Sequence, residues 1–273
     1  MTVLLRYASQ SHAPLSNNPK HQSAARHALV HYPTGAIYSF IPKNACSTLR
    51  LSLAIANRCI ADEKDYAWIH RNNDTFAANL SELVRAPFSF VVLRCPHERL
   101  ASVFLDKIVG RERDMWDLLR HSGEAFDPDT ITFRTFVDLL TKPALLALNI
   151  HWRPQISFLV YQDYTHWFAL ERFDAVGPTL KNSLGLDVHD ARALTQHGSD
   201  YQKTLQEGHF FDTPAWQVAD MKRELTTPYL RCFYDDALAS DVAALYAQDM
   251  QLYAQHCDPR DLLYPALREE LNQ

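Results

Sequence analysis

The segment "YSFIPKNACSTLRLSL", Tyr38 to Leu53, brings a cation and small polar residues together at one turn of the chain. Lys43 stands between an apolar run and the hydroxyl residues Ser47 and Thr48, after which apolar residues recur at helical spacing. Backbone N–H groups, hydroxyls and a lysine at a helix N-terminus are groups that bind phosphate or sulfate. Because the segment contains no glycine, neither the Walker pattern nor the dinucleotide-binding fingerprint fits. The sequence therefore predicts an anion site of another kind.

A second segment, "FSFVVLRCPHERLASVFLDK", repeats this arrangement. Arg94 ends an apolar run, and Ser102 lies in the second turn of the helix that we expect to follow. The two side chains are candidates for binding a second phosphate group. In the alternative interpretation, Arg94 forms an ion pair with Glu98, and Ser102 is only a small packing residue. The segment alone leaves both interpretations open.

Buried strands, each followed by a loop and a helix, must position these side chains. We expect strands at residues 36–41 and 88–94, because both runs are short, apolar and rich in β-branched or aromatic residues. We expect helices from Thr48 to Asn57 and from His97 onward, where apolar residues recur at helical spacing. Two such units predict an α/β fold with a central parallel sheet flanked by helices and a functional crevice at the carboxyl ends of the strands.

The rest of the chain predicts helical elaborations of a single domain. Residues 132–140 and 236–253 have helical periodicity, and residues 172–177 are expected to form a short strand. Residues 1–30 are expected to form a mobile arm, because much of this stretch is polar, contains prolines and lacks periodicity. The main domain is then expected to span residues 31–273.

The composition excludes several classes of protein. A net charge of −5 and a pI near 6.2 argue against a nucleic-acid-binding surface, which needs a broad excess of basic residues. The five cysteines are scattered and form no CxxC pair, so we expect neither a disulfide framework nor a metal site. The apolar patch Val3 to Leu5 is too short for a signal peptide or a membrane span. These features predict a cytoplasmic protein with no membrane span.

The segment "IPKNACSTLR" resembles the motif by which sulfotransferases hold the 5′-phosphosulfate of PAPS (3′-phosphoadenosine 5′-phosphosulfate), and "VVLRCPHERLASVFLDK" resembles their 3′-phosphate motif. The similarity is closest to carbohydrate sulfotransferases of the chondroitin 4-O-sulfotransferase kind, which also carry a segment similar to "HWRPQISFL", His151 to Leu159. The resemblance covers residues 38–174 and implies a P-loop-like sulfotransferase fold. It implies PAPS as sulfuryl donor, PAP (adenosine 3′,5′-bisphosphate) as product, no metal, and these binding residues: Pro42, Lys43, Asn44, Ala45, Cys46, Ser47, Thr48, Arg94 and Ser102. Outside the resemblance, the polar segment Thr195 to Leu205 is a candidate lid over the nucleotide, and its Lys203 is a candidate for neutralising the 3′-phosphate.

Some departures from this family pattern bear on the substrate. Ala45 replaces the usual glycine, and His97 replaces the aromatic residue before Glu98-Arg99. The transmembrane anchor and the downstream cysteines of the Golgi enzymes are missing. We therefore expect a cytoplasmic, bacterial-type relative that acts on a hydroxyl-bearing acceptor. We expect this acceptor to be a carbohydrate, and the departures leave open whether it is a glycosaminoglycan.

Sulfuryl transfer needs a cation at the leaving oxygen and a base for the acceptor hydroxyl. The resemblance implies Lys43 as the cation. His70 lies between the two PAPS segments, where several carbohydrate sulfotransferases place their base, and it is the first candidate. His151 is the second candidate, as a base or as a residue that positions the acceptor.

Two alternatives to this enzyme remain at the level of the sequence. One is a phosphate-loop nucleotide kinase, which the missing GK[ST] sequence and the missing acidic magnesium motif disfavour. The other is a PAP- or glycan-binding protein that kept the fold but lost turnover. Release of PAP from PAPS in the presence of an acceptor would distinguish the enzyme from both.

Overall fold

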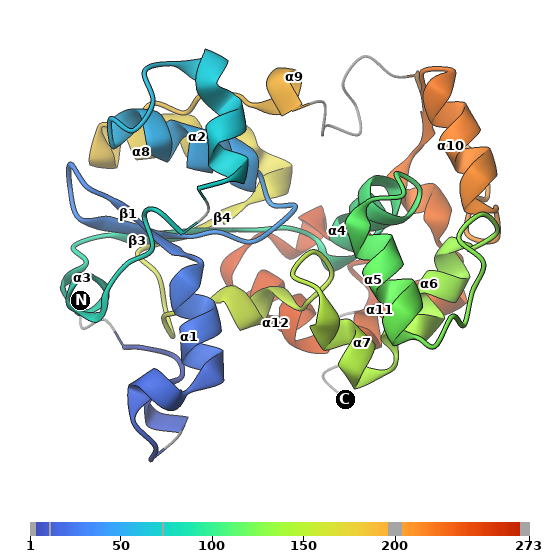
Figure 1. Cartoon of the computed structure of the whole chain (residues 1–273), viewed down its shortest axis with the longest axis horizontal. Coiled ribbons are helices and arrows are strands. Elements are labelled where there is room, and N and C mark those ends of the chain that lie inside the picture. The colour runs from blue at the N-terminus through green and yellow to red at the C-terminus, as the bar shows by residue number, and fades with distance from the viewer. Residues whose placement is uncertain (1–3, 11, 73, 196–203, 268–273) are drawn as a thin grey trace. The chain divides into compact units, whose positions relative to one another are not determined.

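The computed structural model describes residues 4–10, 12–72, 74–195 and 204–267 (Figure 1). The chain forms two compact units, each built from two stretches. The first unit combines residues 1–93 with 155–195, and the second combines residues 94–154 with 196–273. Because the chain passes from one unit to the other three times, neither unit is a continuous domain.

A mixed sheet forms the centre of the first unit. Its strand order is β1 (Ala28–His31), β2 (Ala36–Ser39), β3 (Ser89–Leu93) and β4 (His166–Ala169). β2, β3 and β4 are parallel, and β1 adds an antiparallel edge to β2. The predicted α/β fold with a central parallel sheet flanked by helices is therefore confirmed, with one antiparallel strand added at its edge.

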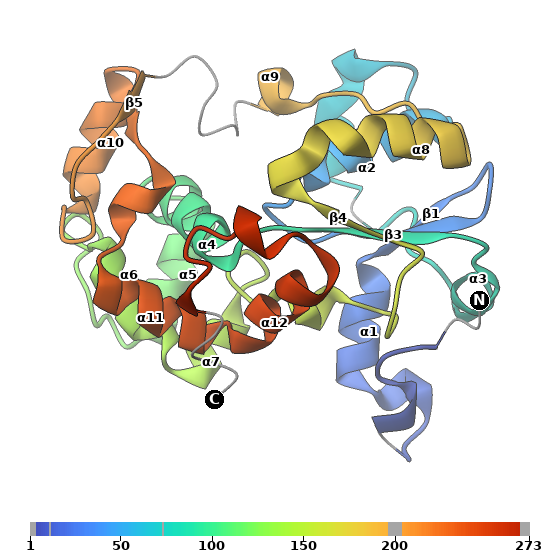
Figure 2. The same cartoon turned by 180° about the vertical axis from the view of Figure 1, so that it is seen from behind.

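Helices cover both faces of this sheet. α2 (Cys46–Ala56) and α8 (Val176–Leu184) lie on one face, and α1 (Pro19–Arg26) lies on the other (Figures 1 and 2). Every residue of β2 and β3 is buried, as expected for strands covered on both sides. The remaining helices of this unit are α3 (Leu80–Arg85), α9 (Arg192–Thr195) and the 3₁₀ helices η3 (Glu63–His70), η5 (Gln155–Phe158) and η6 (Leu170–Ala175), besides η1 (Ala8–Gln10) and η2 (Leu15–Asn17) near the N-terminus.

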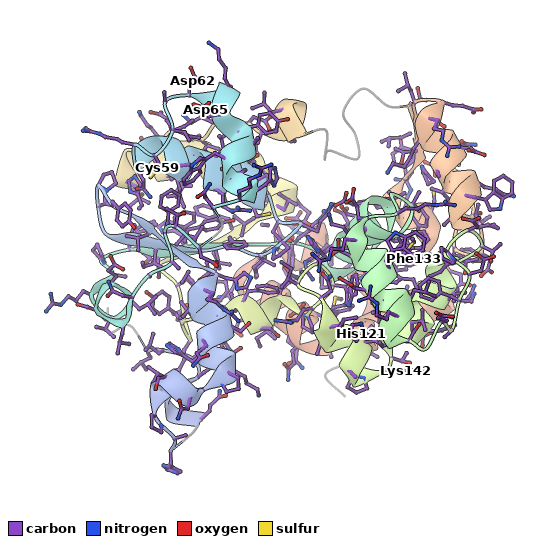
Figure 3. The ribbon with its side chains drawn as sticks, in the orientation of Figure 1. Cys59, Asp62, Asp65, His121, Phe133 and Lys142 are labelled. Carbon is purple, nitrogen blue, oxygen red and sulfur yellow. The ribbon has the colours of Figure 1, made fainter. Side chains whose placement is uncertain are left out.

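The second unit is mainly helical and has a core of its own. Its helices are α4 (Pro96–Val103), the π-helix η4 (Phe104–Ile108), α5 (Arg113–His121), α6 (Phe133–Leu140), α7 (Pro143–Leu148), α10 (Ala215–Arg223), η7 (Leu230–Phe233), α11 (Asp236–Leu245), α12 (Ala247–His256) and η8 (Pro259–Asp261). β5 (Thr204–Gln206) and β6 (Thr226–Pro228) form a short parallel pair. Phe133, labelled in Figure 3, is fully buried, with its ring 5.4 Å from that of Phe104 and 5.5 Å from that of Phe233.

Three expectations about elements need correction. Residues 172–177 form no strand: they belong to η6 and the first turn of α8, where Pro178 is tolerated because that turn needs no N–H donor. The helix expected over residues 236–253 is broken at Tyr246 (φ −110°, ψ 30°) into α11 and α12. The sheet begins at Ala28, within the segment that we expected to be an arm, and α1 precedes it. Within the described residues, no helix is long and apolar enough to cross a membrane.

Candidate functional site

The loop that follows β2 has a strained backbone at two residues. Lys43 (φ 73°) and Ala45 (φ 54°) both adopt the left-handed conformation, which favours glycine. For a residue with a Cβ this conformation costs about 1–2 kcal/mol, and such strain is concentrated at binding and catalytic sites. Ala45 occupies the position where related loops carry glycine, so the strain explains that preference. The left-handed conformations of these two residues turn the short loop after β2 into the start of α2.

The N-terminus of α2 faces the end of this loop. Ala45 is the N-cap residue, and its side chain provides no capping hydrogen bond. The first N–H groups of a helix have no partner within the helix, and they lie at the positive end of its dipole. Cys46, Ser47 and Thr48 therefore present backbone donors of the kind that bind phosphate and sulfate.

Asn44 fixes the loop from inside the first unit. Its fully buried side chain donates Nδ2 hydrogen bonds to the carbonyl of Val92 in β3 at 2.9 Å and to Oε1 of Gln155 at 2.6 Å. We expected Asn44 among the residues that hold PAPS, but its side chain is engaged within the fold. Gln155, which the sequence analysis did not single out, comes from the "HWRPQ" segment. Its position in that segment was the available signal.

Thr48, Ser52 and Arg50 connect α2 to its neighbours. The Thr48 hydroxyl accepts a hydrogen bond from the backbone N–H of Ala191 at 3.2 Å, and Ser52 Oγ accepts one from the N–H of His189 at 2.9 Å. Thr48 keeps its own hydroxyl proton for donation. The buried Arg50 donates to the carbonyl of Ile69 in η3, and burial lowers the pKa of its guanidinium.

Arg94 and Ser102 both lie in the second unit. Arg94 directly follows the last residue of β3, and its buried guanidinium Nη2 is 3.7 Å from Oε2 of Glu98. The ion pair of the alternative interpretation is therefore present, at a distance longer than a hydrogen bond. Ser102 is buried in the last turn of α4.

Arg99 holds the segment that carries His151. Its buried guanidinium donates hydrogen bonds to the carbonyls of Arg153 at 2.9 Å and of Ile150 at 3.3 Å. Arg99 matched the second motif, but no local pattern predicted this contact, because its partners lie about fifty residues away. The third motif is thus positioned by an arginine of the second one.

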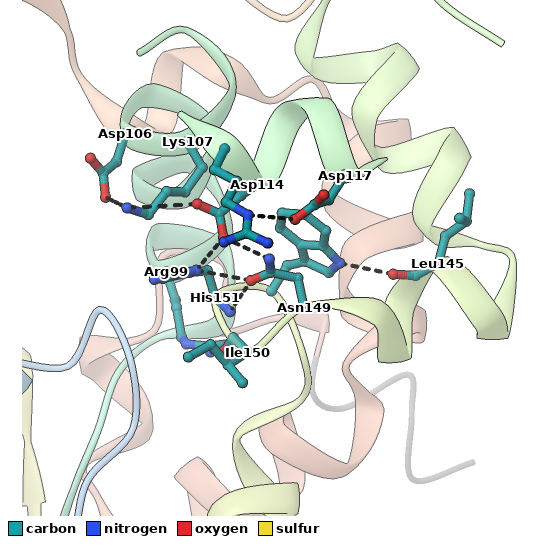
Figure 4. A network of polar contacts seen from close by, with 11 residues as sticks. Arg99, Asp106, Lys107, Asp114, Asp117, Leu145, Asn149, Ile150 and His151 are labelled. Carbon is teal, nitrogen blue, oxygen red and sulfur yellow. Dashed lines mark hydrogen bonds and ion pairs between the residues drawn. The ribbon is translucent and has the colours of Figure 1, made fainter. Parts of the chain in front are cut away.

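His151 lies beside α5 in a network of polar contacts (Figure 4). Its Nδ1 is 3.0 Å from Oδ1 of Asp114 and 2.9 Å from Oδ1 of Asn149. Asn149 Nδ2 donates to Asp114 Oδ1 at 2.6 Å, and Lys107 Nζ lies 3.3 Å from Asp106 and 4.0 Å from Asp114. Burial would raise the pKa of Asp114, but hydrogen bonds from His151 and Asn149 and the charge of Lys107 lower it to about 2.

The other predicted residues have varied surroundings. His70 is exposed as the last residue of η3. Pro42 is buried, whereas Cys46 and Ser47 are half-buried. Lys203 lies outside the described residues. Trp152, beside His151, is fully buried and donates Nε1 to the carbonyl of Leu145 at 2.9 Å, so it belongs to the core. In the described part of the chain, no group of three or more His, Cys, Asp or Glu residues could hold a metal.

A sequence model of the sulfotransferase family matches residues 26–254. Searches among curated proteins and among solved structures gave no significant match. The matched region contains the Lys43 loop, the segment of Arg94 and Ser102, and the segment of His151. It includes residues of both units and covers far more than half of the chain. The chain belongs to the sulfotransferase family.

Proposed function

We propose that this protein is a cytoplasmic enzyme that transfers a sulfuryl group from PAPS to a hydroxyl of a carbohydrate-containing acceptor. Membership of the family supports sulfuryl transfer in general. The observation that carries the finer proposal is the strained loop at Lys43 and Ala45, which leads into the uncapped N-terminus of α2. The five cysteines of the protein are free, which is typical of proteins in a reducing compartment.

The loop Pro42 to Thr48 is proposed to hold the 5′-phosphosulfate. Backbone N–H groups of Cys46, Ser47 and Thr48 would donate to the phosphosulfate oxygens, with the Thr48 hydroxyl as a further donor. Lys43 would stabilise the negative charge that grows on the oxygen leaving sulfur, which needs a cation fixed in place before the reaction. Asn44 contributes indirectly, by holding the loop through Val92 and Gln155.

Arg94, Ser102 and Lys203 are proposed to hold the 3′-phosphate. Arg94 follows β3 in the chain, and β3 is the parallel neighbour of β2, whose loop carries Lys43. Guanidinium groups bind phosphate through paired hydrogen bonds. The carbohydrate acceptor rests on the resemblance to chondroitin 4-O-sulfotransferases, and either His70 or His151 would accept its proton.

Binding of PAP tests the donor site. A ligand that binds only the folded protein, at about 100 times its dissociation constant, adds ~2.7 kcal/mol to the free energy of unfolding. That corresponds to a rise of roughly 5 °C or more in Tm for a chain of this size. ATP, which lacks the 3′-phosphate, should give a much smaller rise.

The control for this measurement is an arginine of α5. Arg94→Ala should remove most of the preference for PAP over ATP, whereas Arg113→Ala should keep it, because Arg113 pairs with Asp117 at the surface. Equal Tm shifts with ATP and PAP in the wild type would contradict the assignment.

Turnover tests the reaction. We expect release of PAP from PAPS when the protein is incubated with a panel of glycosaminoglycan and other glycan oligosaccharides, accompanied by a gain of one sulfate on the acceptor. Tight PAP binding without turnover on any acceptor would instead favour the non-catalytic binding protein. Transfer of phosphate from ATP would favour the kinase.

A further inference from the structure

Outside the loop Pro42 to Thr48, titratable side chains form a hydrogen-bonded cluster around His151. Figure 4 shows Asp114, Asn149 and His151 converging, with Lys107 between Asp114 and Asp106. The cluster joins three parts of the second unit: α5, the segment after α7, and η4. Only His151 was expected from the sequence.

The contacts of Asn149 determine which atom faces His151. Its Oδ1 accepts a hydrogen bond from the backbone N–H of His151 at 2.9 Å, and its Nδ2 donates to Asp114 at 2.6 Å. Exchanging the amide oxygen and nitrogen would put a donor against the backbone N–H and an acceptor against a carboxylate. The orientation of the Asn149 amide is therefore fixed by its neighbours.

This orientation fixes the tautomer of His151. Its Nδ1 faces two oxygens, Oδ1 of Asp114 and Oδ1 of Asn149, and both can only accept. Nδ1 therefore carries the proton, and in the neutral ring Nε2 carries the lone pair. The side chain is 23% exposed, so the ring is held by its partners but not enclosed.

Asp114 remains ionised beside the ring. Lys107 contributes to this, and η4 brings its ammonium group to 4.0 Å from Oδ2 of Asp114. A carboxylate that accepts the Nδ1 proton of an imidazole orients the ring and stabilises the imidazolium that forms when Nε2 takes up a second proton. His70, exposed at the end of η3, is the rival for this role.

We propose that Asp114 and Asn149 are positioning residues that hold His151 with Nε2 ready to take the proton of the acceptor hydroxyl. This inference rests on the proposed sulfuryl transfer. The acceptor oxygen forms a bond to sulfur while the bond from sulfur to the 5′-phosphate oxygen breaks, and PAP leaves with that electron pair. The hydroxyl proton moves to Nε2, and the resulting imidazolium returns it to solvent.

The tautomer is tested without any acceptor. In protein labelled with ¹⁵N-histidine, a spectrum that correlates ring nitrogens with ring protons assigns His151 by comparison with His151→Gln. We expect the neutral ring to carry its proton on Nδ1. A proton on Nε2 would overturn the proposal, whatever the protein catalyses.

The use of Nε2 is tested by the pH dependence of turnover. His151→Gln should lower kcat by roughly 10²-fold or more and remove the acid limb of the profile, while PAP binding stays nearly intact. Asp114→Asn keeps the shape of the side chain but removes its charge. It should lower kcat and move the acid limb toward lower pH, because the imidazolium loses its carboxylate partner.

Asp117→Asn on the same helix is the matched control. Asp117 pairs with Arg113 and Arg120 on the surface of α5, and its replacement should leave the profile unchanged. A profile that is the same in wild type and Asp114→Asn would overturn the positioning role. An acid limb that survives in His151→Gln but disappears in His70→Ala would assign the base to His70.

The readouts separate this inference from the proposed function. If the wild type binds PAP but neither sulfates a glycan nor hydrolyses PAPS, the proposed enzymatic activity is refuted, and with it the use of Nε2. The tautomer found in the spectrum would still report whether Asp114 and Asn149 orient the ring. A wild type that turns over with an unchanged profile in all variants would refute only the role of the His151 network.

Discussion

At the scale of single residues, the loop Pro42 to Thr48, which we propose as the donor site, shows how a short sequence can fix the shape of a backbone. Lys43 and Ala45 hold left-handed conformations that glycine would adopt with less strain. Asn44 lies between them, and its buried side-chain amide anchors the loop through hydrogen bonds to Val92 and Gln155. The loop is thereby held in one shape, so in the proposed reaction its backbone would not have to reorganise.

Lys43 provides the first test at this scale. Lys43→Ala should lower kcat by roughly 10²–10³-fold while changing the dissociation constant of PAP far less, because the proposed role is to stabilise charge that grows in the transition state. Lys64→Ala is the control, since Lys64 is almost fully exposed. A loss of PAPS affinity with kcat unchanged would make Lys43 a binding group only.

The sequence identified residues that stand in short local patterns but missed the residues that hold them. Lys43, Arg94 and His151 each follow an apolar run or lie in a recognisable segment. Asp114 carries no such mark, because its partner His151 lies far along the chain and is brought to it only by folding. Gln155 and Arg99 lie within matched segments, but their partners were equally hidden.

At the scale of elements, the π-helix η4 positions the end of the second motif, where Lys107 contacts Asp114. It continues α4 through residues 104–108 and closes with a hydrogen bond from Val109 N–H to the carbonyl of Phe104 at 2.9 Å. Lys107 and Asp106 lie in this wider turn, and Lys107 Nζ is 3.3 Å from Asp106 and 4.0 Å from Asp114. Single-turn π-helices within α-helices are frequent at functional sites. The sequence predicted a helix here but could not predict its wider turn, since no residue pattern distinguishes the two.

Gly110 makes this turn sterically possible. A Cβ at Gly110 would lie 2.2 Å from the carbonyl oxygen of Asp106, so the backbone would have to shift. Gly110→Ala should therefore lower the free energy of unfolding by about 3 kcal/mol, measured by urea titration. Gly185→Ala is the control: it has open space around the new Cβ and only its left-handed φ of 67°, which costs about 1 kcal/mol. Equal losses in the two variants would show that the contact with Asp106 is not the cause.

Element boundaries depended on long-range packing as well as on local pattern. The strands at β2 and β3 and the helices α2 and α4 were predicted from apolar runs and their spacing. The break at Tyr246 was not, because nothing in the local sequence interrupts the helical periodicity. The Tyr246 hydroxyl donates to the carbonyl of Trp152 at 2.6 Å, a contact between distant segments that the periodicity does not contain.

At the scale of the whole molecule, buried histidines make stability depend on pH. His97 is fully buried in α4, where its Nε2 donates to the carbonyl of Ala239 at 2.9 Å and the rings of Tyr234 and Tyr264 lie within 5.3 Å. Burial lowers the pKa of His97 to about 4, although the hydrogen bond to Ala239 opposes this. The unfolded chain, with an ordinary histidine, takes up this proton at higher pH than the folded one.

The free energy of unfolding should therefore fall as the pH decreases from neutral to about 4, and His97 accounts for about 1.5 kcal/mol of that fall between pH 6.5 and pH 5. At pH 6.5 the unfolded histidine is still half protonated, so the contribution is complete only about one pH unit higher. His97→Phe, a residue that cannot titrate, should give a flatter dependence in urea titrations across this range, whatever its absolute stability. His121→Phe, at an exposed position, should keep the wild-type slope. Parallel curves for wild type and His97→Phe would rule His97 out as the source.

Because each unit is built from two separate stretches of the chain, the central sheet cannot be completed early during synthesis on the ribosome. β3 is complete at Leu93, but its parallel partner β4 begins only at His166, after a stretch that belongs to the second unit. At translation rates of about 5–20 residues per second, the nascent chain presents the unpaired backbone edge of β3 for roughly 4–15 s. Until translation reaches β4, that edge is open to pairing with other chains, and a chaperone that shields it would be of most use during this interval.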